Sequence, residues 1–261
     1  MPLPPALIGL YQSAALFVPA IGRPAQPFVI VGAARSGSTL LQSLLGSHPH
    51  VVCMNEILGR SARKTQFRRY YAGQRGRLRQ VGKQDPARLA ETVLLSPQPP
   101  GVRAIGFKLL YNQPADLQKR DELWNRLASW PELRVLRTVS NPARSALSFC
   151  IAMETGKWVN QQVDGDIRVD TDLLLNRLRK DDQRAAKVAS LFTDGQVLDV
   201  RAKEVLHDPE ASAALLRHIG VEPRPLTTTT KRQNPVDMAQ VVANYDEVLA
   251  ALEGTEWEGQ L

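Results

Sequence analysis

Residues 28–45 read FVIVGAARSGSTLLQSLL and decide the fold of this chain. The first four, Phe28 to Val31, are apolar and partly β-branched, which is typical of a strand buried on both faces of a sheet. Leucines recur at helical spacing after Thr39. The small residues between the two elements allow main-chain N–H groups to converge at a helix N-terminus. This turn therefore predicts an anion site, and phosphate is the obvious anion.

The turn has the spacing of the Walker A loop, Gly-x-x-x-x-Gly-Lys-Ser/Thr, with one departure. Ser38 stands where that motif has the lysine that reaches the outer phosphates of ATP. The cation of this turn is Arg35, which lies on the loop before the helix. The missing lysine argues against hydrolysis of ATP or GTP. The alternative to an anion site is a tight turn whose glycines only let strand and helix pack.

An Ala-Arg-Ser-Gly-Ser-Thr turn after a buried strand resembles the 5′-phosphosulfate loop of the sulfotransferases that use 3′-phosphoadenosine 5′-phosphosulfate. The resemblance extends over most of the chain after residue 28 and is strongest in this loop. It implies a three-layer, P-loop-like α/β fold with a central parallel sheet flanked by helices. It also implies this cofactor, whose product is adenosine 3′,5′-bisphosphate. The loop residues implied to bind it are Arg35, Ser36, Gly37, Ser38 and Thr39.

Length and charge limit the number of domains and the kind of partner. The chain has 261 residues, and we expect 28–261 to form one α/β domain. A formal net charge of +7 predicts an anionic partner, whether cofactor, substrate, nucleic acid or membrane. Cys53 and Cys150 form no disulfide framework, which favours buried thiols in a reducing, cytoplasmic setting. Residues 1–27 fit neither a secretory signal nor a bilayer span, so we expect an N-terminal extension, with peripheral membrane contact left open.

Apolar periodicity predicts the remaining elements of the domain. Strands are expected at 51–54, 104–111, 133–139 and 197–200. Helices are expected at 87–95, 116–130, 149–159, 172–192, after a cap at 207–210, and at 236–252.

Glu56 follows the second expected strand, and ligands of parallel sheets gather beyond the carboxyl ends of the strands. It is therefore placed to face the same crevice as Arg35. Residues 47–58, SHPHVVCMNEIL, resemble the segment of carbohydrate and nodulation-factor sulfotransferases that carries a glutamate base. The resemblance implies that Glu56 takes the proton of the acceptor hydroxyl. The alternatives are a surface carboxylate or a helix-cap neighbour for Glu56, and His48 or His50 as the base.

Lys108 interrupts the apolar strand expected at 104–111, where a lysine is costly unless its amine reaches an anion or water. The segment resembles a sulfotransferase strand whose lysine points to the sulfonate and the bridging oxygen. Lys108 and Arg35 are thus implied to stabilise charge on the departing phosphate. In the cytosolic members a histidine base follows by two positions, whereas this chain has Leu110 there, which favours Glu56 as the base. The alternative is an edge-strand lysine that extends to solvent.

Residues 140–148, SNPARSALS, resemble the family's 3′-phosphate motif, in which a serine follows an arginine by eight positions. Ser148 has that offset, which implies that it binds the 3′-phosphate. Ser140 takes the place of the arginine. Arg137 or Arg144 then has to supply the charge, because charge-assisted hydrogen bonds are about twice as strong as neutral ones. An ordinary helical serine is the alternative for Ser148.

Two further basic segments are candidate parts of the site. Residues 227–235 are similar to the C-terminal loop of nodulation-type sulfotransferases, which implies that Lys231 and Arg232 close over the 3′-phosphate. Residues 60–83 are dense in Lys and Arg with interspersed aromatics, which favours an acceptor-side lid with a helix followed by a Gly-Gln-Arg-Gly loop. A disordered basic loop and a solvated helix face are the respective alternatives.

The sequence thus predicts an enzyme that moves the sulfuryl group of 3′-phosphoadenosine 5′-phosphosulfate to the hydroxyl of a carbohydrate or small molecule. Glu56 is the expected base, Arg35 and Lys108 are the expected catalytic cations, and no metal is required. The acceptor is left open among a sugar, a lipid headgroup and a small phenol. The alternatives are a P-loop nucleotide kinase or hydrolase, and a basic nucleic-acid-binding protein, although no nucleic acid is expected as a partner.

Overall fold

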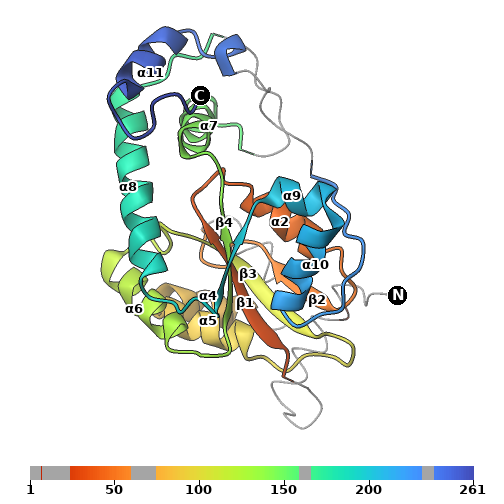
Figure 1. The fold of residues 1–261 in the computed structure, drawn as a ribbon. Coiled ribbons are helices and arrows are strands. Elements are labelled where there is room, and N and C mark those ends of the chain that lie inside the picture. The colour runs from red at the N-terminus through yellow and green to blue at the C-terminus, as the bar shows by residue number, and fades with distance from the viewer. Residues whose placement is uncertain (1–6, 8–23, 60–74, 159–165, 231–237) are drawn as a thin grey trace.

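The computed structural model describes residues 7, 24–59, 75–158, 166–230 and 238–261. In this part of the chain a five-stranded parallel sheet forms the middle layer, in the order β2-β3-β1-β4-β5 (Figure 1). The predicted α/β fold with a central parallel sheet between helices is confirmed. The strands are β1 (Gln26–Gly32), β2 (Val51–Met54), β3 (Ala104–Leu110), β4 (Arg134–Thr138) and β5 (Val197–Val200).

Strand β1 is central because its residues are apolar toward both faces, and Phe28 to Val31 are fully buried. It pairs with β3 on one side and with β4 on the other. The chain passes from β1 to the edge strand β2, returns through β3 and then continues to β4 on the far side of β1. Ligands of open α/β sheets bind beyond the carboxyl ends of strands at such a reversal. The loops after β1, β3 and β4 are therefore the expected walls of a site.

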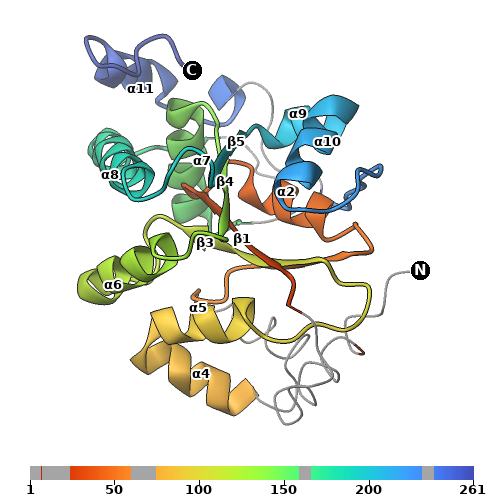
Figure 2. The ribbon, with the colours of Figure 1, turned by 60° about the horizontal axis from the view of Figure 1, so that its bottom comes forward.

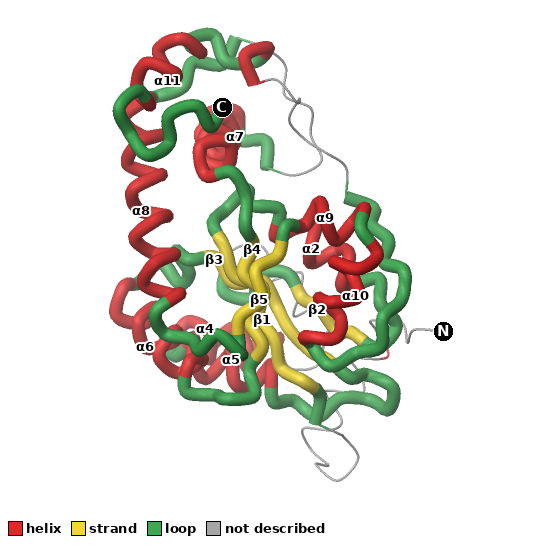
Figure 3. The backbone as a smooth tube through the Cα atoms, viewed as in Figure 1, coloured by secondary structure: helices red, strands yellow, loops and turns green. Residues whose placement is uncertain are grey.

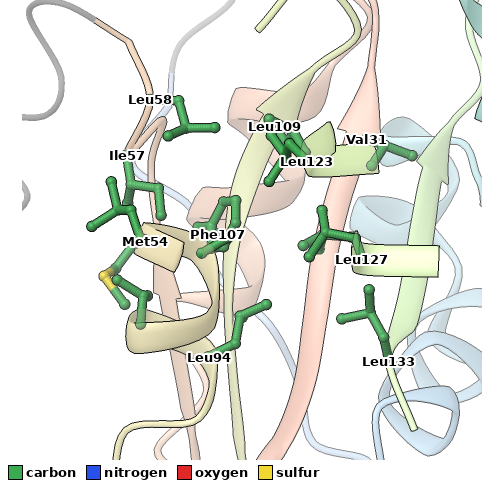
Figure 4. Packing of buried hydrophobic residues seen from close by; sticks show 14 of the residues in the cluster. Val31, Met54, Ile57, Leu58, Leu94, Phe107, Leu109, Leu123, Leu127 and Leu133 are labelled. Carbon is green, nitrogen blue, oxygen red and sulfur yellow. The ribbon is translucent and has the colours of Figure 1, made fainter. Parts of the chain in front are cut away.

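Helices cover both faces of the sheet (Figure 2). On one face, Phe107 and Leu109 of β3 belong to a buried cluster with Leu123 and Leu127 (Figure 4). Side chains alternate along a strand, so Lys108 points to the opposite face. The first face carries α4 (Arg75–Gln84), α5 (Pro86–Leu94) and α6 (Leu117–Ala128), and the opposite face carries α2 (Ser38–Leu45), α9 (Ala202–His207) and α10 (Pro209–His218).

A third apolar cluster lies beyond the carboxyl ends of the strands (Figure 3). The long helix α8 joins this cluster to the sheet, because its Leu174 belongs to the third cluster and its Val188 to the core around β3. The helices of the third cluster are α7 (Pro142–Thr155), α8 (Thr171–Ala189) and α11 (Tyr245–Leu252).

Helix α7 starts directly after β4, and local sequence fixes both of its ends. The Asn141 side chain accepts a hydrogen bond from the Arg144 N–H, and Pro142 takes the first helical position, where its missing N–H costs nothing. The helix ends at Thr155, before the expected limit at 159, because Gly156 adopts a left-handed φ of 67°. The N-terminus of α7 therefore lies at the carboxyl edge of the sheet.

The helix expected over 236–252 is wrong in its first half. In the described residues it is replaced by the 3₁₀ turn η3 (Met238–Gln240), an irregular segment and α11. The cause is a long-range contact, since the side chain of Asn244 accepts a hydrogen bond from the N–H of Val169 and donates one to its C=O, each at 2.9 Å. The other expected strands and helices of the described residues are confirmed.

Part of the predicted lid at 60–83 lies within the described residues as α4. This helix begins at Arg75, inside the stretch expected as a loop. Leu78 of α4 is buried in the core around β3, whereas Arg77 and Arg79 are exposed. Residues 60–74 lie outside the described residues, so the lid remains a prediction.

The predicted extension at 1–27 and the basic pair Lys231 and Arg232 also lie outside the described residues, apart from Leu7 and 24–27. In the part of the chain that the structure covers, no helix has the length and apolar character needed to cross a membrane. Cys53 and Cys150 are free and buried, as expected, and burial raises the pKa of the Cys150 thiol to about 11.

Candidate active site

The predicted anion loop joins β1 to α2 and is held in shape by β4. The Ser36 hydroxyl lies 2.6 Å from Oγ1 of Thr138 and 2.8 Å from the C=O of Ala33. A Cβ at Gly32 would lie 1.9 Å from Oγ1 of Thr138, so only glycine fits there. Gly37, with a φ of 87°, precedes the first turn of α2. These contacts leave main-chain N–H groups of the loop and of α2 facing one region, which is the geometry of an anion site.

Arg35 adopts a left-handed φ of 71°, which is uncommon for a residue other than glycine and occurs where surrounding contacts hold it. Its Nε donates to Oγ of Ser148 at 2.9 Å, and its Nη1 donates to the C=O of Trp158 at 2.6 Å. Partial burial lowers the pKa of the guanidinium from its usual value. The structure therefore brings together two residues, Arg35 and Ser148, that the sequence assigned to opposite ends of the cofactor.

A cavity of about 650 Å³ opens beside this loop, between the carboxyl ends of β1, β4 and β5. We call it the cation cavity, because four cations and one carboxylate, Glu204, are the charged residues that line it. Its volume falls in the range of small-molecule sites. Its polar lining includes Arg35, Ser36, Ser140, Asn141, Arg144, Ser145, Ser148, Arg201 and Lys203.

Helix α7 presents one polar face to the cation cavity. Asn141, Arg144, Ser145 and Ser148 follow the helical spacing i, i+3, i+4 and i+7, and all four line the cavity. The Ser145 hydroxyl lies 2.9 Å from that of Ser140 and donates to the C=O of Arg35. The N-termini of α2 and α7 thus meet at one cavity, and each carries a partial positive charge.

Arg137, a candidate for the 3′-phosphate charge, does not line the cation cavity. Its guanidinium makes two hydrogen bonds to the carboxylate of Asp199, at 2.6 and 2.7 Å. This pairing raises the pKa of Arg137. Of the two arginines that the sequence offered for the missing charge, the cavity therefore contains Arg144.

The sequence did not indicate two cavity cations, Arg201 and Lys203. They come from the N-terminal end of α9, directly after β5. Their position after a strand of the sheet was the available signal, since the loop after β1 was chosen on the same ground. Thr138 was also missed, because its role depends on a contact with Ser36 across 102 positions of sequence.

A second group of polar residues lies around Glu56, on the β2 and β3 side of β1. Nζ of Lys108 lies 2.8 Å from Oε1 of Glu56 and donates to Oγ1 of Thr39 at 3.0 Å. Nε2 of Gln113, a residue that the sequence did not indicate, donates to Oε2 of Glu56 at 2.5 Å. We call these four residues the Glu56 cluster. The Lys108 side chain is only 7% exposed, so its charge needs these partners.

The cation cavity and the Glu56 cluster share α2, whose first turn contributes Gly37 to the former and Thr39 to the latter. Glu56 itself does not line the cavity. The single crevice expected for Glu56 and Arg35 is thus resolved into two neighbouring groups. Ser38, expected to bind cofactor, is buried in the first turn of α2.

The rival bases lie in other surroundings. Nε2 of His48 lies 3.0 Å from the C=O of Glu222, and its Nδ1 accepts from the N–H of His50. Nδ1 of His48 is therefore an acceptor, so Nε2 carries the proton of a neutral ring. Burial lowers the pKa of His48. Nδ1 of His50 lies 2.6 Å from the C=O of Gly101. Both rings thus serve a turn, as their sequence position favoured.

Comparison with known proteins agrees with this geometry. The family model described as the sulfotransferase family matches residues 27–225, so the chain belongs to the sulfotransferase family. Nodulation protein H of Rhizobium tropici is 25% identical over 232 residues, which are 85% of this chain and 88% of that protein. Nodulation protein H of Rhizobium meliloti (strain 1021) is 25% identical over 237 residues, covering 86% and 90%.

Among solved structures, the sulfotransferase domain from the curacin biosynthetic pathway superposes with a TM-score of 0.50 at 15% identity. The match covers 78% of this chain and 76% of that chain, and it supports the fold. The predicted family and the predicted transferase class are thereby confirmed. The kinase and nucleic-acid alternatives are not favoured.

Proposed function

We propose that this sulfotransferase takes the sulfuryl group from 3′-phosphoadenosine 5′-phosphosulfate and transfers it to a carbohydrate hydroxyl, with Glu56 as the general base. The observation that carries the proposal is the pair of anion-binding features in the cation cavity. The loop after β1 and the polar face of α7 each offer a helix N-terminus and cations. A nucleotide with charged groups at both its 5′ and 3′ positions matches this arrangement better than one charged at a single end.

The residues of the cavity fit such a cofactor chemically. The loop of Arg35, Ser36 and Gly37 would hold the 5′ end, with N–H donors and one guanidinium. Ser148 and Arg144 would hold the 3′-phosphate, and charge-assisted hydrogen bonds from Arg144 replace what Ser140 lacks. Lys231 and Arg232 remain proposed contributors from the C-terminal loop. No metal is required in this proposal, because the cavity already has an excess of cations.

The bound cofactor supplies an activated sulfuryl group, whose bond to the phosphate oxygen breaks as a bond to the acceptor oxygen forms. Glu56 takes the acceptor's proton on a carboxylate oxygen. Lys108 and Arg35 provide positive charge near the oxygen that becomes negative. In phosphoryl transfer, positioning and electrostatics carry most of the acceleration, and we extend that reasoning to sulfuryl transfer by analogy.

A carbohydrate acceptor is proposed because the relatives matched over most of their length are nodulation proteins H, which the sequence resemblance groups with carbohydrate sulfotransferases. We also propose a cytoplasmic location, supported by two buried, free cysteines. Peripheral membrane contact through residues 1–27 remains part of the proposal that concerns partners.

The direct test is transfer of ³⁵S from labelled cofactor to a panel containing oligosaccharides, a phenol and a lipid headgroup. We expect label on the oligosaccharides, without added metal. Label on the phenol or the headgroup alone would move the acceptor class. No transfer to any hydroxyl, together with Mg-dependent ATP turnover, would contradict the proposal.

A further inference from the structure

Both oxygens of the Glu56 carboxylate are engaged by side chains from the β3 region. Oε1 lies 2.8 Å from Nζ of Lys108, and Oε2 accepts a hydrogen bond from Nε2 of Gln113 at 2.5 Å. The two partners differ in kind. Lys108 carries a mobile ammonium group at the end of a four-carbon stem, whereas Gln113 is a neutral donor on a shorter side chain.

The backbone fixes the direction of the Gln113 amide. Its Oε1 accepts from the N–H of Leu110 at 3.4 Å, and its own N–H donates to the C=O of Leu110 at 2.9 Å. The next residue, Tyr111, donates its N–H to the C=O of Gly32, at the start of the anion loop, at 3.1 Å. With its oxygen turned to Leu110, the amide presents its NH₂ group to Glu56. The turn after β3 thus links the base to the anion loop.

Gly59 provides independent evidence that space is reserved for this pair. A Cβ at Gly59 would lie 3.0 Å from Oε2 of Glu56 and 3.5 Å from Nε2 of Gln113. Few Cβ contacts are as short as the first of these. Any residue other than glycine would therefore press on the hydrogen bond between Glu56 and Gln113.

Lys108 has two partners in this structure, Glu56 and Thr39, and the proposed mechanism also assigns it to the departing phosphate. A lysine that turns toward the departing group no longer orients the base. We propose that Gln113 is the positioning residue of Glu56, which keeps the carboxylate ionised and aimed while Lys108 changes partners. This inference rests on the proposed role of Glu56 as the base.

The electrostatic surroundings of Glu56 are simple enough to test. Among the described residues, Lys108 is the charged group in contact with Glu56, and the Cys53 thiol of β2 faces the same ammonium group. A hydrogen bond donated to a carboxylate favours its ionised form. Removing the Gln113 donor therefore makes Glu56 easier to protonate, and the base is lost at a higher pH.

The experiment compares Gln113→Leu with the wild-type enzyme and with Gln118→Leu as a matched control. Gln118 makes the same type of hydrogen bond, to Glu122 at 3.1 Å, on the exposed face of α6. We expect Gln113→Leu to shift the acidic limb of the kcat/KM profile upward by about one pH unit. At pH 6 this corresponds to a loss of about tenfold, recovered in part at high pH. The control profile should not move.

Two readouts do not depend on turnover. The carbon-13 signal of the Glu56 carboxyl, assigned with Glu56→Gln, should titrate about one pH unit higher in ligand-free Gln113→Leu. The Kd for adenosine 3′,5′-bisphosphate should stay within about twofold, since Gln113 does not line the cation cavity. If Gln113→Leu does not fold, Gln113→Glu keeps the side-chain length and places a second carboxyl group at Oε2, so the limb should move further up. An unshifted profile and titration in the variant that folds would overturn the inference.

Glu56→Gln, assayed in parallel, separates this inference from the proposed function. If Glu56→Gln loses turnover and Gln113→Leu keeps the wild-type profile, the positioning role alone is wrong. If Glu56→Gln keeps full turnover, the assignment of the base is wrong and the role of Gln113 falls with it. Gly59→Ala should reproduce the shift of Gln113→Leu more weakly, because its Cβ crowds the same hydrogen bond.

Discussion

The cation cavity and the Glu56 cluster are neighbours on α2, yet their polar groups are arranged differently. In the cavity, cations and hydroxyls from β1, β4 and β5 surround about 650 Å³ of space. In the cluster, each carboxylate oxygen of Glu56 already has a partner within 2.8 Å. The first arrangement suits a group that arrives with its own charge. The second suits a group whose direction must be set before the reaction, since preorganised polar groups need no rearrangement at the transition state.

The largest effect should come from the base of the Glu56 cluster. Glu56→Gln keeps the size of the side chain and removes the proton acceptor, so kcat should fall by about 10²- to 10⁴-fold. The Kd for the bisphosphate should be unchanged, because Glu56 does not line the cavity. Steady-state kinetics and calorimetry measure the two quantities. Glu91→Gln, which alters an exposed ion pair with Arg126, is the control. A parallel loss of affinity would mean that the two regions act as one.

Arg35 should be the residue whose loss damages binding and chemistry together. Arg35→Ala removes a guanidinium from the cavity and its hydrogen bond to Ser148, so we expect kcat to fall by about 10²- to 10³-fold and bisphosphate affinity to fall as well. Arg137→Ala is the matched control, since Arg137 is paired with Asp199 outside the cavity. Equal losses of affinity in both variants would return Arg137 to the binding site.

Arg144 should affect affinity for one end of the nucleotide. Hydrogen bonds to charged groups contribute about 1.5–3 kcal/mol, so Arg144→Ala should weaken binding of adenosine 3′,5′-bisphosphate by about tenfold or more. Binding of adenosine 5′-phosphate, which lacks the 3′-phosphate, should change by less than about twofold. Isothermal calorimetry with both ligands gives the comparison. Equal weakening of both would place Arg144 at the 5′ end instead.

The smallest effect should come from the histidine turn outside both regions. Burial lowers the pKa of His48 in the folded chain, so the unfolded chain binds more protons and stability should fall as pH drops through about 6.5. The pKa of His218 is lowered in the same direction. His48→Gln should make the urea midpoint depend less on pH between 7.5 and 5.5, with turnover retained. A loss of turnover in this variant would revive His48 as a base.

Local signals in the sequence were sufficient for the sheet and for the anion loop. Strand β1, the glycine-serine turn and α2 are contiguous, and their pattern of apolar and small residues specifies each element directly. Lys108 was also identified, because a cation within a buried strand requires a partner. The identity of that partner came from the structure, which pairs Lys108 with Glu56 and Thr39.

Contacts between distant residues account for what the sequence did not give. Arg137 was a sound candidate by charge, but Asp199 on the neighbouring strand occupies it. The closing helix was predicted too long because Asn244 bonds the backbone of Val169, which lies 75 positions earlier. Gln113 carries no charge and matches no motif, so its contact with Glu56 became visible only when β2 and β3 were placed side by side.

The measurement that tests the central claim most directly is the change in Tm with adenosine 3′,5′-bisphosphate, without metal, beside ATP with Mg²⁺. A ligand at one hundred times its Kd adds about 2.7 kcal/mol to the stability of the folded chain. For a domain of this size that corresponds to a rise in Tm of about 5–10 °C. We predict this rise for the bisphosphate and a much smaller one for ATP with Mg²⁺. A rise with ATP and Mg²⁺ but none with the bisphosphate would contradict the account.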